Sequence, residues 1–202
     1  MTEVVLVRTG TANLASVAAA LGRAGCAVRL TESGDDLASA ERLVLPGVGA
    51  FGAVAERLDA LGLREPLAER LRAGRPTLAV CLGLQLLAEA SDESPGAHGL
   101  GVIKATVTAL PEGVRRPQLG WNRVAAGPGC RLLTDGVAYF ANSYKLDAVP
   151  DGWSGAVTDH GGPFVAALER GAVLACQFHP ELSGPWGQAL VERWLAAAGE
   201  VA

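Results

Sequence analysis

Short apolar runs alternate with helical segments through the first half of this 202-residue chain, and this alternation restricts its fold more than any other feature. The runs have the length and β-branched character of strands that are buried on both faces. We expect strands at residues 4–7, 27–30, 42–45 and 77–81. We expect helices after them: one capped by Asn13 and closed by Gly25, one at 66–72 and one at 83–90. Strands that alternate with helices at this spacing form βαβ units, so the first half predicts a parallel sheet.

The second half has a different pattern, in which strand-like runs follow one another with tight turns between them. These runs lie at residues 102–110, 123–125, 138–142, 154–158, 164–168 and 173–178. A last helix is expected at 186–198. Consecutive strands joined by short turns pair antiparallel, and a chain of this length is expected to form one domain. We therefore predict a single α/β domain over residues 1–202, with a central, mostly parallel sheet flanked by helices and an antiparallel-rich second half.

Charge and composition argue against several classes of protein. The formal net charge is −4 and the Lys and Arg residues form no stripe, so we expect no nucleic-acid partner. No apolar run reaches the roughly 20 residues of a membrane span, and the apolar run at 4–7 is too short for a signal peptide. The four cysteines are far apart and form no cluster with histidine, so we expect no bound metal and free thiols in a reducing cytoplasm.

The strongest local signal is a strand that ends at a cysteine and continues at once into a helix. Residues 77–85 read Thr-Leu-Ala-Val-Cys-Leu-Gly-Leu-Gln, with Cys81 at the junction. This is the pattern of a nucleophile elbow, a strained turn that exposes a nucleophile above a sheet. The small residues Ala79 and Gly83 allow the turn to close, and a helix N-terminus favours the thiolate. Taken alone, the segment also fits a buried cysteine at a strand end. The other cysteines lack this context and are expected to be packing residues: Cys26, Cys130 and Cys176.

A nucleophilic cysteine needs a base, and the chain offers three histidines. His98 and His160 lie in loops that contain glycine, and we expect both at the surface. His179 ends an apolar strand and precedes a proline, which restricts it to extended backbone. Glu181 follows two residues later, so its carboxylate can lie on the same side and orient the imidazole. Cys81, His179 and Glu181 are thus a candidate triad, although an ordinary strand exit also produces a His-Pro-Glu sequence.

A segment with two glycines follows the strand at 42–45. It reads Leu-Pro-Gly-Val-Gly-Ala-Phe at residues 45–51. Gly47 and Gly49 permit close approach of backbone and unusual dihedral angles, so N–H groups here are placed to hold an oxyanion beside Cys81. Loops of this kind also bind phosphate, but no complete phosphate-binding motif is present. By itself the segment is a weak signal.

Together these motifs resemble those of the class I, or triad, glutamine amidotransferases. The sequences at 79–85 and 177–181 (Gln-Phe-His-Pro-Glu) are similar to that whole superfamily. Four further segments resemble one family within it, the glutaminase subunits of imidazole glycerol phosphate synthase, an enzyme of histidine biosynthesis. They are Thr-Gly-Thr-Ala-Asn-Leu-Ala-Ser-Val at 9–17, the two-glycine segment at 45–51, Leu-Gly-Trp-Asn at 119–122 and Tyr-Phe-Ala-Asn-Ser-Tyr at 139–144. The resemblance runs from residue 4 to about residue 196.

The resemblance implies an enzyme that hydrolyses L-glutamine to glutamate and ammonia through a thioester on Cys81, with no metal or cofactor. His179, oriented by Glu181, then protonates the leaving ammonia and activates water. The oxyanion is held by backbone amides near Leu82 and along the segment from Gly47 to Gly49. The same resemblance implies that four side chains help to hold glutamine: Gln85, Glu93, Ser143 and Tyr144.

The resemblance also implies a heterodimer with a cyclase (synthase) subunit. Ammonia travels through a tunnel in that partner, which makes imidazole glycerol phosphate and an aminoimidazole carboxamide ribotide. Glutaminase activity is expected to stay low until the partner binds its nucleotide substrate. Residues 46–49 are the expected switch, because glycine dihedral angles change at modest cost.

Several residues depart from the pattern of that family, and they concern the partner interface and the switch more than the triad. They are Arg8, Ala79, Gln118, Asn142 and Leu182. Two alternatives therefore stay open. One is a glutaminase paralogue that feeds a different synthase, against which the Gly-Trp-Asn sequence at 120–122 argues. The other is a non-catalytic regulatory or redox-sensing protein with a cysteine elbow, which would have no need of the His-Pro-Glu sequence.

Overall fold

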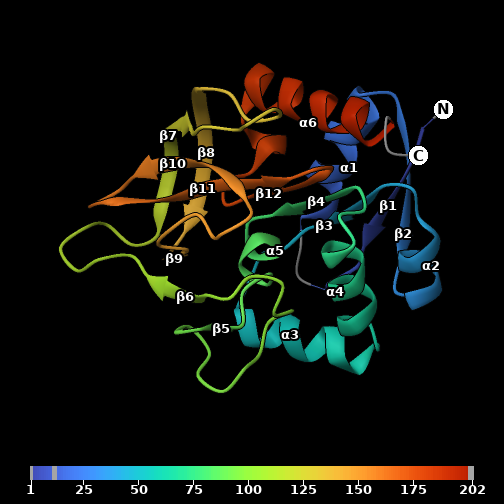
Figure 1. Cartoon of the computed structure of the whole chain (residues 1–202), viewed down its shortest axis with the longest axis horizontal. Helices are drawn as coiled ribbons and strands as arrows, with labels where there is room; N and C mark the ends of the chain where they lie inside the picture. The colour runs from blue at the N-terminus through green and yellow to red at the C-terminus, as the bar shows by residue number, and fades with distance from the viewer. Residues whose placement is uncertain (1, 11–12, 200–202) are drawn as a thin grey trace.

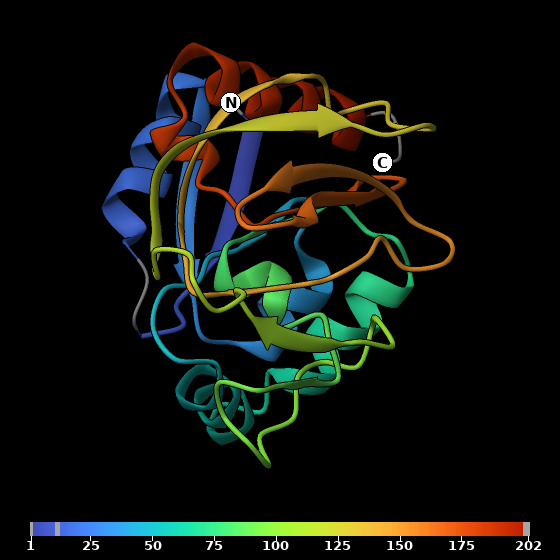
Figure 2. The same ribbon diagram turned by 90° about the vertical axis from the view of Figure 1, so that its left-hand side faces the viewer.

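A mixed sheet forms the centre of the molecule, and helices cover both of its faces (Figures 1 and 2). The computed structural model describes residues 2–10 and 13–199, and within these residues the sheet has nine strands. Their order is β2-β1-β3-β4-β12-β11-β10-β7-β8. Their bounds are β1 (Thr2–Val7), β2 (Cys26–Thr31), β3 (Leu43–Leu45), β4 (Thr77–Val80), β7 (Gln118–Ala126), β8 (Gly136–Asn142), β10 (Ser154–Asp159), β11 (Pro163–Arg170) and β12 (Val173–Cys176).

The sheet is parallel in one half and antiparallel in the other. β2, β1, β3, β4 and β12 are parallel to one another. From β12 onward, β11, β10, β7 and β8 pair antiparallel. The predicted α/β class, with a parallel first half and an antiparallel-rich second half, is confirmed. A second, small sheet contains β5 (Ala90–Ser91), β6 (Thr106–Ala109) and β9 (Tyr144–Lys145).

The helices form a layer on each face of the large sheet (Figure 1). One layer contains α1 (Leu14–Arg23) and α6 (Gly184–Gly199). The other contains α2 (Gly34–Ser39), α3 (Phe51–Ala60), α4 (Arg64–Arg72) and the short α5 (Leu82–Gln85). A 3-10 turn, η1 (Pro180–Leu182), precedes α6. None of the helices within the described residues has the length and apolar character required to span a bilayer.

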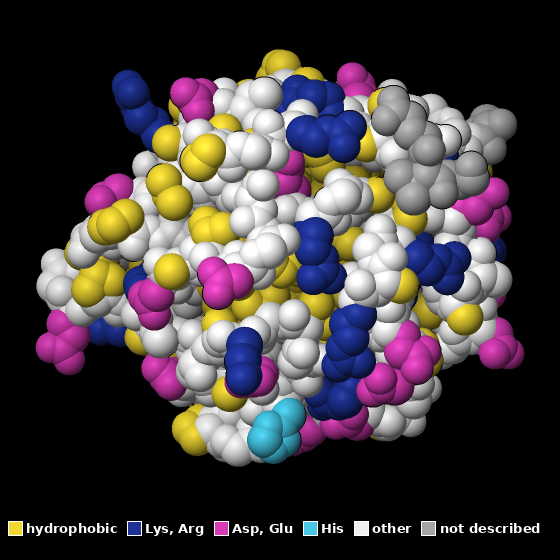
Figure 3. All heavy atoms as spheres, viewed as in Figure 1, with side chains coloured by type: hydrophobic (Ala, Val, Ile, Leu, Met, Phe, Trp, Pro, Cys, Tyr) yellow, Lys and Arg dark blue, Asp and Glu magenta, His cyan; other side chains and the backbone are white. Residues whose placement is uncertain are grey.

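Alternate side chains of β1 enter the two cores, as expected for a strand buried on both faces. Val4 and Leu6 pack with α1 and α6, while Val5 and Val7 pack with α2, α3 and α4. Acidic and basic side chains are intermingled over the face of the molecule shown in Figure 3.

The predicted start of α1 is confirmed. The Asn13 side chain accepts a hydrogen bond from the amide of Ser16, and Gly25 takes the positive φ of +79° that ends the helix. Two residues of the sequence motif at 9–17, Thr11 and Ala12, lie outside the described residues.

The helix predicted at 83–90 is wrong, because α5 ends at Gln85. The carbonyls of Leu86, Leu87 and Ala88 accept hydrogen bonds from amides of residues 100–103 instead of from the next helical turn. The predicted strand at 102–110 is shortened for the same reason, since the amides of residues 102 and 103 both bond to Leu87. These hydrogen bonds join segments that are distant in sequence, and no local pattern predicts them.

Two helices, α2 and α3, were not predicted from the sequence. The N-terminus of α3 is stabilised from a distant loop: the amide of Phe51 donates to the Glu93 carboxylate at 2.6 Å, and the amide of Gly52 to the Ser94 hydroxyl at 3.0 Å. Other elements have shifted bounds. α4 begins at Arg64 and not at residue 66, β7 extends well beyond the predicted 123–125, and β12 ends before the predicted residue 178.

A buried arginine ties α2, α4 and β4 together. Arg70 is 2% exposed, and its guanidinium donates to backbone carbonyls and one hydroxyl, with no carboxylate partner among the described residues. The acceptors are the carbonyls of Leu37, Ala40, Glu41 and Pro76 and the hydroxyl of Thr77. Burial, together with the charge of Arg75, lowers the pKa of Arg70 to about 10, so it remains charged at neutral pH.

We predict that Arg70→Met lowers the free energy of unfolding by about 3 kcal/mol or more, because it leaves buried carbonyls unpaired. Urea denaturation measures the loss. The control is Arg72→Met on the same helix, where the side chain is 50% exposed and pairs with Glu65 at the surface; about 1 kcal/mol or less is expected. Equal losses in the two variants would contradict the role assigned to Arg70.

Candidate active site

Cys81 occupies a tight turn between β4 and α5, with a backbone conformation that residues other than glycine rarely adopt. Its φ is 53° and its ψ is −108°, and it is the one non-glycine residue with a positive φ among those described. The Cys81 amide donates to the carbonyl of Cys176 at 2.6 Å, which extends the β4–β12 ladder to the strained residue. This is the strand-to-helix turn that the sequence predicts.

Small residues allow neighbouring segments to approach this turn closely. A Cβ atom added to Gly83 would lie 2.3 Å from the Leu45 carbonyl oxygen and 3.5 Å from the Cβ of Ala79. A Cβ added to Gly47 would lie 2.7 Å from the Cβ of Leu82. The segment after β3 therefore packs directly against the Cys81 turn, and side chains at these two glycines would separate them.

His179 and Glu181 form a buried pair. The Nδ1 of His179 lies 2.8 Å from Oε1 of Glu181, and the two side chains are 7% and 5% exposed. The backbone of His179 is fixed from two sides. Its amide donates to the Tyr139 carbonyl at 2.9 Å, and the Ser183 hydroxyl donates to its carbonyl at 2.6 Å while accepting from the Tyr139 amide.

His179 also interacts with Cys81 across the cavity that both residues line, and Nδ1 is already directed to Glu181. An ionised carboxylate only accepts hydrogen bonds, so Nδ1 carries a proton for Glu181 and the other nitrogen is directed to the cysteine. Burial of the ring lowers the pKa of His179, but its hydrogen bonds to Cys81 and Glu181, and the charges of those groups, outweigh burial and raise it to about 10. The structure therefore brings the three predicted triad residues together.

Cys81 and His179 open into a cavity of about 290 Å³. Its other lining residues are Val48, Gly49, Leu82, Gln85, Glu93, Pro117, Ala141, Asn142, Ser143 and Tyr144. Most of the residues predicted to bind glutamine or its oxyanion thus surround the sulfur. Gly47 lies behind the cavity wall, against Leu82.

The amide predicted to hold an oxyanion is occupied in this structure. The N–H of Leu82 donates to the carbonyl of Gly47 at 3.3 Å. Gly49, two residues along, has a φ of +104°. The segment from Gly47 to Gly49 is therefore next to Cys81, as predicted, but it presents a carbonyl oxygen to the Leu82 amide.

Two of the predicted glutamine-binding side chains already have hydrogen-bond partners inside the protein. Nε2 of Gln85 donates to the Tyr144 carbonyl at 3.1 Å and to Oε1 of Gln177 at 3.0 Å. One oxygen of Glu93 accepts from the amide of Phe51. Both residues nevertheless line the cavity.

Sequence reasoning missed the contact of Gln177 with the nucleophile. Gln177 is fully buried, and its Nε2 lies 3.6 Å from the sulfur of Cys81. No local pattern predicts this contact, because β12 ends at Cys176 and the chain bends at residues 177 and 178 before it reaches His179.

None of the remaining cysteines and histidines lines this cavity. Burial raises the pKa of the thiols of Cys26, Cys130 and Cys176, which keeps them protonated. His98 is exposed, and His160 is half-buried with its Nε2 2.8 Å from the Arg115 carbonyl. No group of three or more His, Cys, Asp and Glu side chains in the described part of the chain could hold a metal ion.

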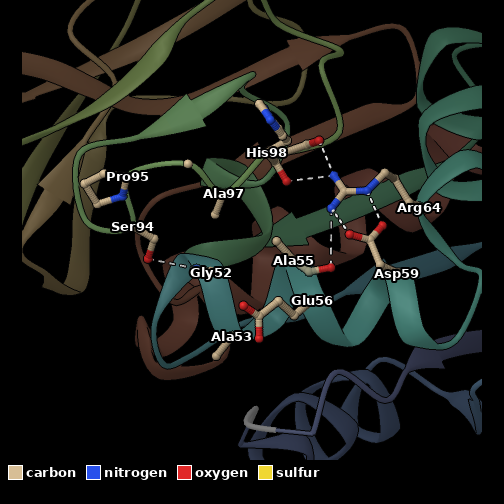
Figure 4. Close-up of a pocket in the computed structure, with 12 residues that line it drawn as sticks. Gly52, Ala53, Ala55, Glu56, Asp59, Arg64, Ser94, Pro95, Ala97 and His98 are labelled. Carbon is tan, nitrogen blue, oxygen red and sulfur yellow. Dashed lines mark hydrogen bonds and ion pairs between the residues drawn. The ribbon is translucent and has the colours of Figure 1, made fainter.

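A larger hollow of about 860 Å³ lies between α3, α4 and the loop at 94–99 (Figure 4). Arg64 extends along one side of it, where it pairs with Asp59 and donates to the His98 carbonyl at 2.7 Å. Ser94, in the same loop, accepts from the amide of Gly52. These contacts hold the loop that carries Glu93 against α3, and no triad residue lines this hollow.

Comparison with known proteins identifies the family. The family model described as glutamine amidotransferase class-I matches residues 5–198. The chain is 43% identical to the imidazole glycerol phosphate synthase subunit HisH of Deinococcus radiodurans, over 94% of this chain and 91% of that protein. The chain belongs to the HisH family of class I glutamine amidotransferases.

One further relative and one solved structure agree with this family and this fold. The chain is 36% identical over 95% of its length to the chloroplastic imidazole glycerol phosphate synthase hisHF of Arabidopsis thaliana, and covers 34% of that longer protein. A crystal structure of a glutamine amidotransferase has the same fold, with a TM-score of 0.77 and 22% identity over 96% of this chain and 98% of the other.

We predict that His179 stabilises the folded protein most below about pH 6.5. Its pKa rises from 6.5 to about 10 on folding, so this contribution is fully present below the lower value and is lost as pH increases through the higher one. The measurement is the difference in free energy of unfolding between the unmodified protein and His179→Gln, from urea denaturation at several pH values. It should shrink steadily between about pH 6.5 and 10. A difference that stays constant over this range would contradict the prediction.

Proposed function

We propose that this protein is the glutaminase subunit of an imidazole glycerol phosphate synthase. It hydrolyses L-glutamine to glutamate and ammonia, and it delivers the ammonia to a cyclase subunit. That partner makes imidazole glycerol phosphate and aminoimidazole carboxamide ribotide in histidine biosynthesis. The observation that carries the proposal is the strained turn of Cys81, with His179 and Glu181 paired beside it at one cavity.

The triad supplies each proton transfer that the reaction needs. The Cys81 thiolate attacks the carboxamide carbon of glutamine, and the protonated His179 gives a proton to the nitrogen as the C–N bond breaks. Ammonia leaves and a thioester remains. His179 then takes a proton from water, the hydroxide attacks the thioester, and glutamate departs as the Cys81 thiolate is restored. Glu181 stabilises the imidazolium throughout.

Side chains on the cavity wall are suited to bind glutamine. Glu93 offers a carboxylate to the α-ammonium group, and one of its oxygens already accepts from Phe51. Ser143, directly after β8, Tyr144, in β9, and Gln85, in α5, line the cavity near Cys81 and would contact the rest of the substrate. These roles are part of the proposal.

The hydrogen bond from the Leu82 amide to the Gly47 carbonyl occupies a donor that the oxyanion would need, so the proposed oxyanion site is closed in this structure. If the peptide between Gly47 and Val48 turns over, the Leu82 amide becomes free and the Val48 amide turns toward the cavity. Two donors would then face the developing oxyanion, and each is typically worth about 3 kcal/mol of barrier. We propose that docking of the cyclase with its nucleotide substrate favours this second arrangement.

An exposed apolar patch beside the cavity supports a docking partner. We define it by Leu119, Trp121 and Leu182, which are 57%, 59% and 42% exposed. Leu119 pairs with Ala141, which lines the cavity, and the ring of Trp121 stacks edge-on against Tyr139, whose carbonyl holds His179. The patch is thus continuous with the rim of the catalytic cavity, and we propose that the cyclase covers it.

The cysteines are free thiols, which supports the proposed location in a reducing cytoplasm.

Cys81→Ser tests the proposal directly. In a complex with the cyclase, this variant should lose glutamine-dependent synthesis by about 100-fold or more and keep ammonia-dependent synthesis, because only the nucleophile is changed. Product formation is measured with glutamine and with an ammonium salt. The matched control is Cys130→Ser, at a half-buried position outside the elbow, and it should retain both activities. Retained glutamine use by Cys81→Ser would exclude Cys81 as the nucleophile, and absence of any complex with the cyclase would exclude the proposed partner.

Gly49→Val tests the switch. Glycine changes its dihedral angles at modest cost, whereas a β-branched residue has few allowed conformations and is strained at the present φ of +104°, so the segment should no longer exchange between its two arrangements. We expect at least a tenfold loss of partner-stimulated glutamine hydrolysis with unchanged ammonia-dependent synthesis. Gly74→Val, at a comparable φ of +69° after α4, is the control for strain alone and should leave the stimulation intact. Unchanged stimulation in Gly49→Val would refute the role of this segment.

A further inference from the structure

A buried chain of amide hydrogen bonds ends at the catalytic sulfur. It begins at the Tyr144 carbonyl, which accepts from Nε2 of Gln85 at 3.1 Å. The same nitrogen donates to Oε1 of Gln177 at 3.0 Å, and Nε2 of Gln177 donates to the sulfur of Cys81 at 3.6 Å. Gln85 is 5% exposed and Gln177 is fully buried. Because both side chains are buried, their hydrogen-bond partners in the protein determine how the two amides are oriented.

The direction of this chain follows from its first member. A backbone carbonyl only accepts hydrogen bonds, so Gln85 must present its NH₂ group to Tyr144. The NH₂ group of Gln85 also faces Gln177, which must therefore turn its oxygen toward Gln85. The NH₂ group of Gln177 is then left facing the sulfur. The orientation of an amide, which cannot be read from its shape alone, is decided here by a carbonyl two hydrogen bonds away.

This orientation favours a negative charge on the sulfur. A thiolate accepts hydrogen bonds strongly, whereas a neutral thiol sulfur accepts only weakly. Besides Cys81, the ionisable groups on the cavity wall are His179, with Glu181 behind it, Glu93 from the loop after β5, and Tyr144 in β9. From β8 the sulfur meets the Ala141 carbonyl at 3.9 Å, an acceptor that suits the thiol form. Gln177 is thus a neutral donor that supports the thiolate together with the imidazolium.

We propose that Gln177 is a catalytic residue that stabilises the thiolate of Cys81 by a hydrogen bond, and that Gln85 acts as a positioning residue by fixing the orientation of the Gln177 amide. The inference rests on the proposed function, in which Cys81 is the nucleophile. In this proposal, Gln177 acts at two steps of the reaction. The hydrogen bond maintains the thiolate before glutamine binds, and it stabilises the same thiolate when it leaves the thioester.

The test measures the reactivity of the sulfur without any glutamine. Iodoacetamide alkylates Cys81, and peptide mass spectrometry follows this one site over about pH 5–10. Gln177→Met removes the donor at similar size. We expect the pH of half-maximal alkylation to rise by about one unit, and the rate at pH 7 to fall about tenfold, since hydrogen bonds to charged groups are worth roughly that factor. An unchanged profile in the folded variant would overturn the proposal.

Gln177→Glu keeps the size and the hydrogen bond from Gln85 but turns an acceptor toward the sulfur. The pH of half-maximal alkylation should again rise, and by more than in Gln177→Met. This variant decides the question if Gln177→Met does not fold, as judged by its thermal unfolding. A profile that equals that of the unmodified protein would again overturn the role of Gln177.

Gln85→Glu tests the positioning role. The substitution removes the donor that faces Gln177, so the Gln177 amide should rotate and present its oxygen to the sulfur. The half-maximal pH should then rise although residue 85 does not donate to Cys81. Gln188→Met, at a glutamine in α6, is the matched control and should leave the profile unchanged. If Gln85→Glu leaves it unchanged too, Gln85 does not position Gln177.

A separate assay distinguishes failure of this inference from failure of the proposed function. Glutamine hydrolysis by the unmodified protein with the cyclase tests the function alone. If that complex hydrolyses no glutamine, the function is wrong, whereas the alkylation profiles still decide whether Gln177 stabilises the thiolate.

Discussion

The strained backbone at Cys81 is the constraint on which the rest of the site depends. A non-glycine residue at a positive φ costs about 1–3 kcal/mol, and such a conformation persists only where its surroundings enforce it. Here the ladder bond to Cys176 holds the residue, and the absence of side chains at Gly47 and Gly83 allows the neighbouring segments to close around it. The result is a buried sulfur that lines a cavity together with an imidazole.

Sheet topology explains how residues so distant in sequence meet. β4 and β12 are parallel neighbours, with Val80 opposite Cys176, so both strands end at the same edge of the sheet. Cys81 follows one strand and His179 follows the other. β8, from the antiparallel half, contributes a further wall through Ala141 and the residues after it. This arrangement places a site at the carboxyl ends of parallel strands, where α/β proteins commonly bind ligands.

The site combines fixed and adjustable parts. His179 and Glu181 are buried, and backbone bonds to Tyr139 and Ser183 hold them in place. The segment from Gly47 to Gly49 is tied to the elbow by the Leu82 amide at 3.3 Å, and both ends of it are glycines. Proton-transfer groups need a constant geometry, whereas an oxyanion site that depends on a partner needs two available backbone arrangements. The distribution of glycine in the chain matches that difference.

Local patterns in the sequence determined the backbone of the site but not its full set of contacts. The alternating strands and helices, the Asn13 cap, the elbow at Cys81 and the spacing of His179 and Glu181 were all readable, because each depends on residues a few positions apart. Only the tertiary structure decided where α5 ends, how Glu93 stabilises the start of α3, and that Gln177 faces the sulfur. Each of these depends on hydrogen bonds between segments that are far apart in the chain, and such bonds leave no periodic signal in either segment.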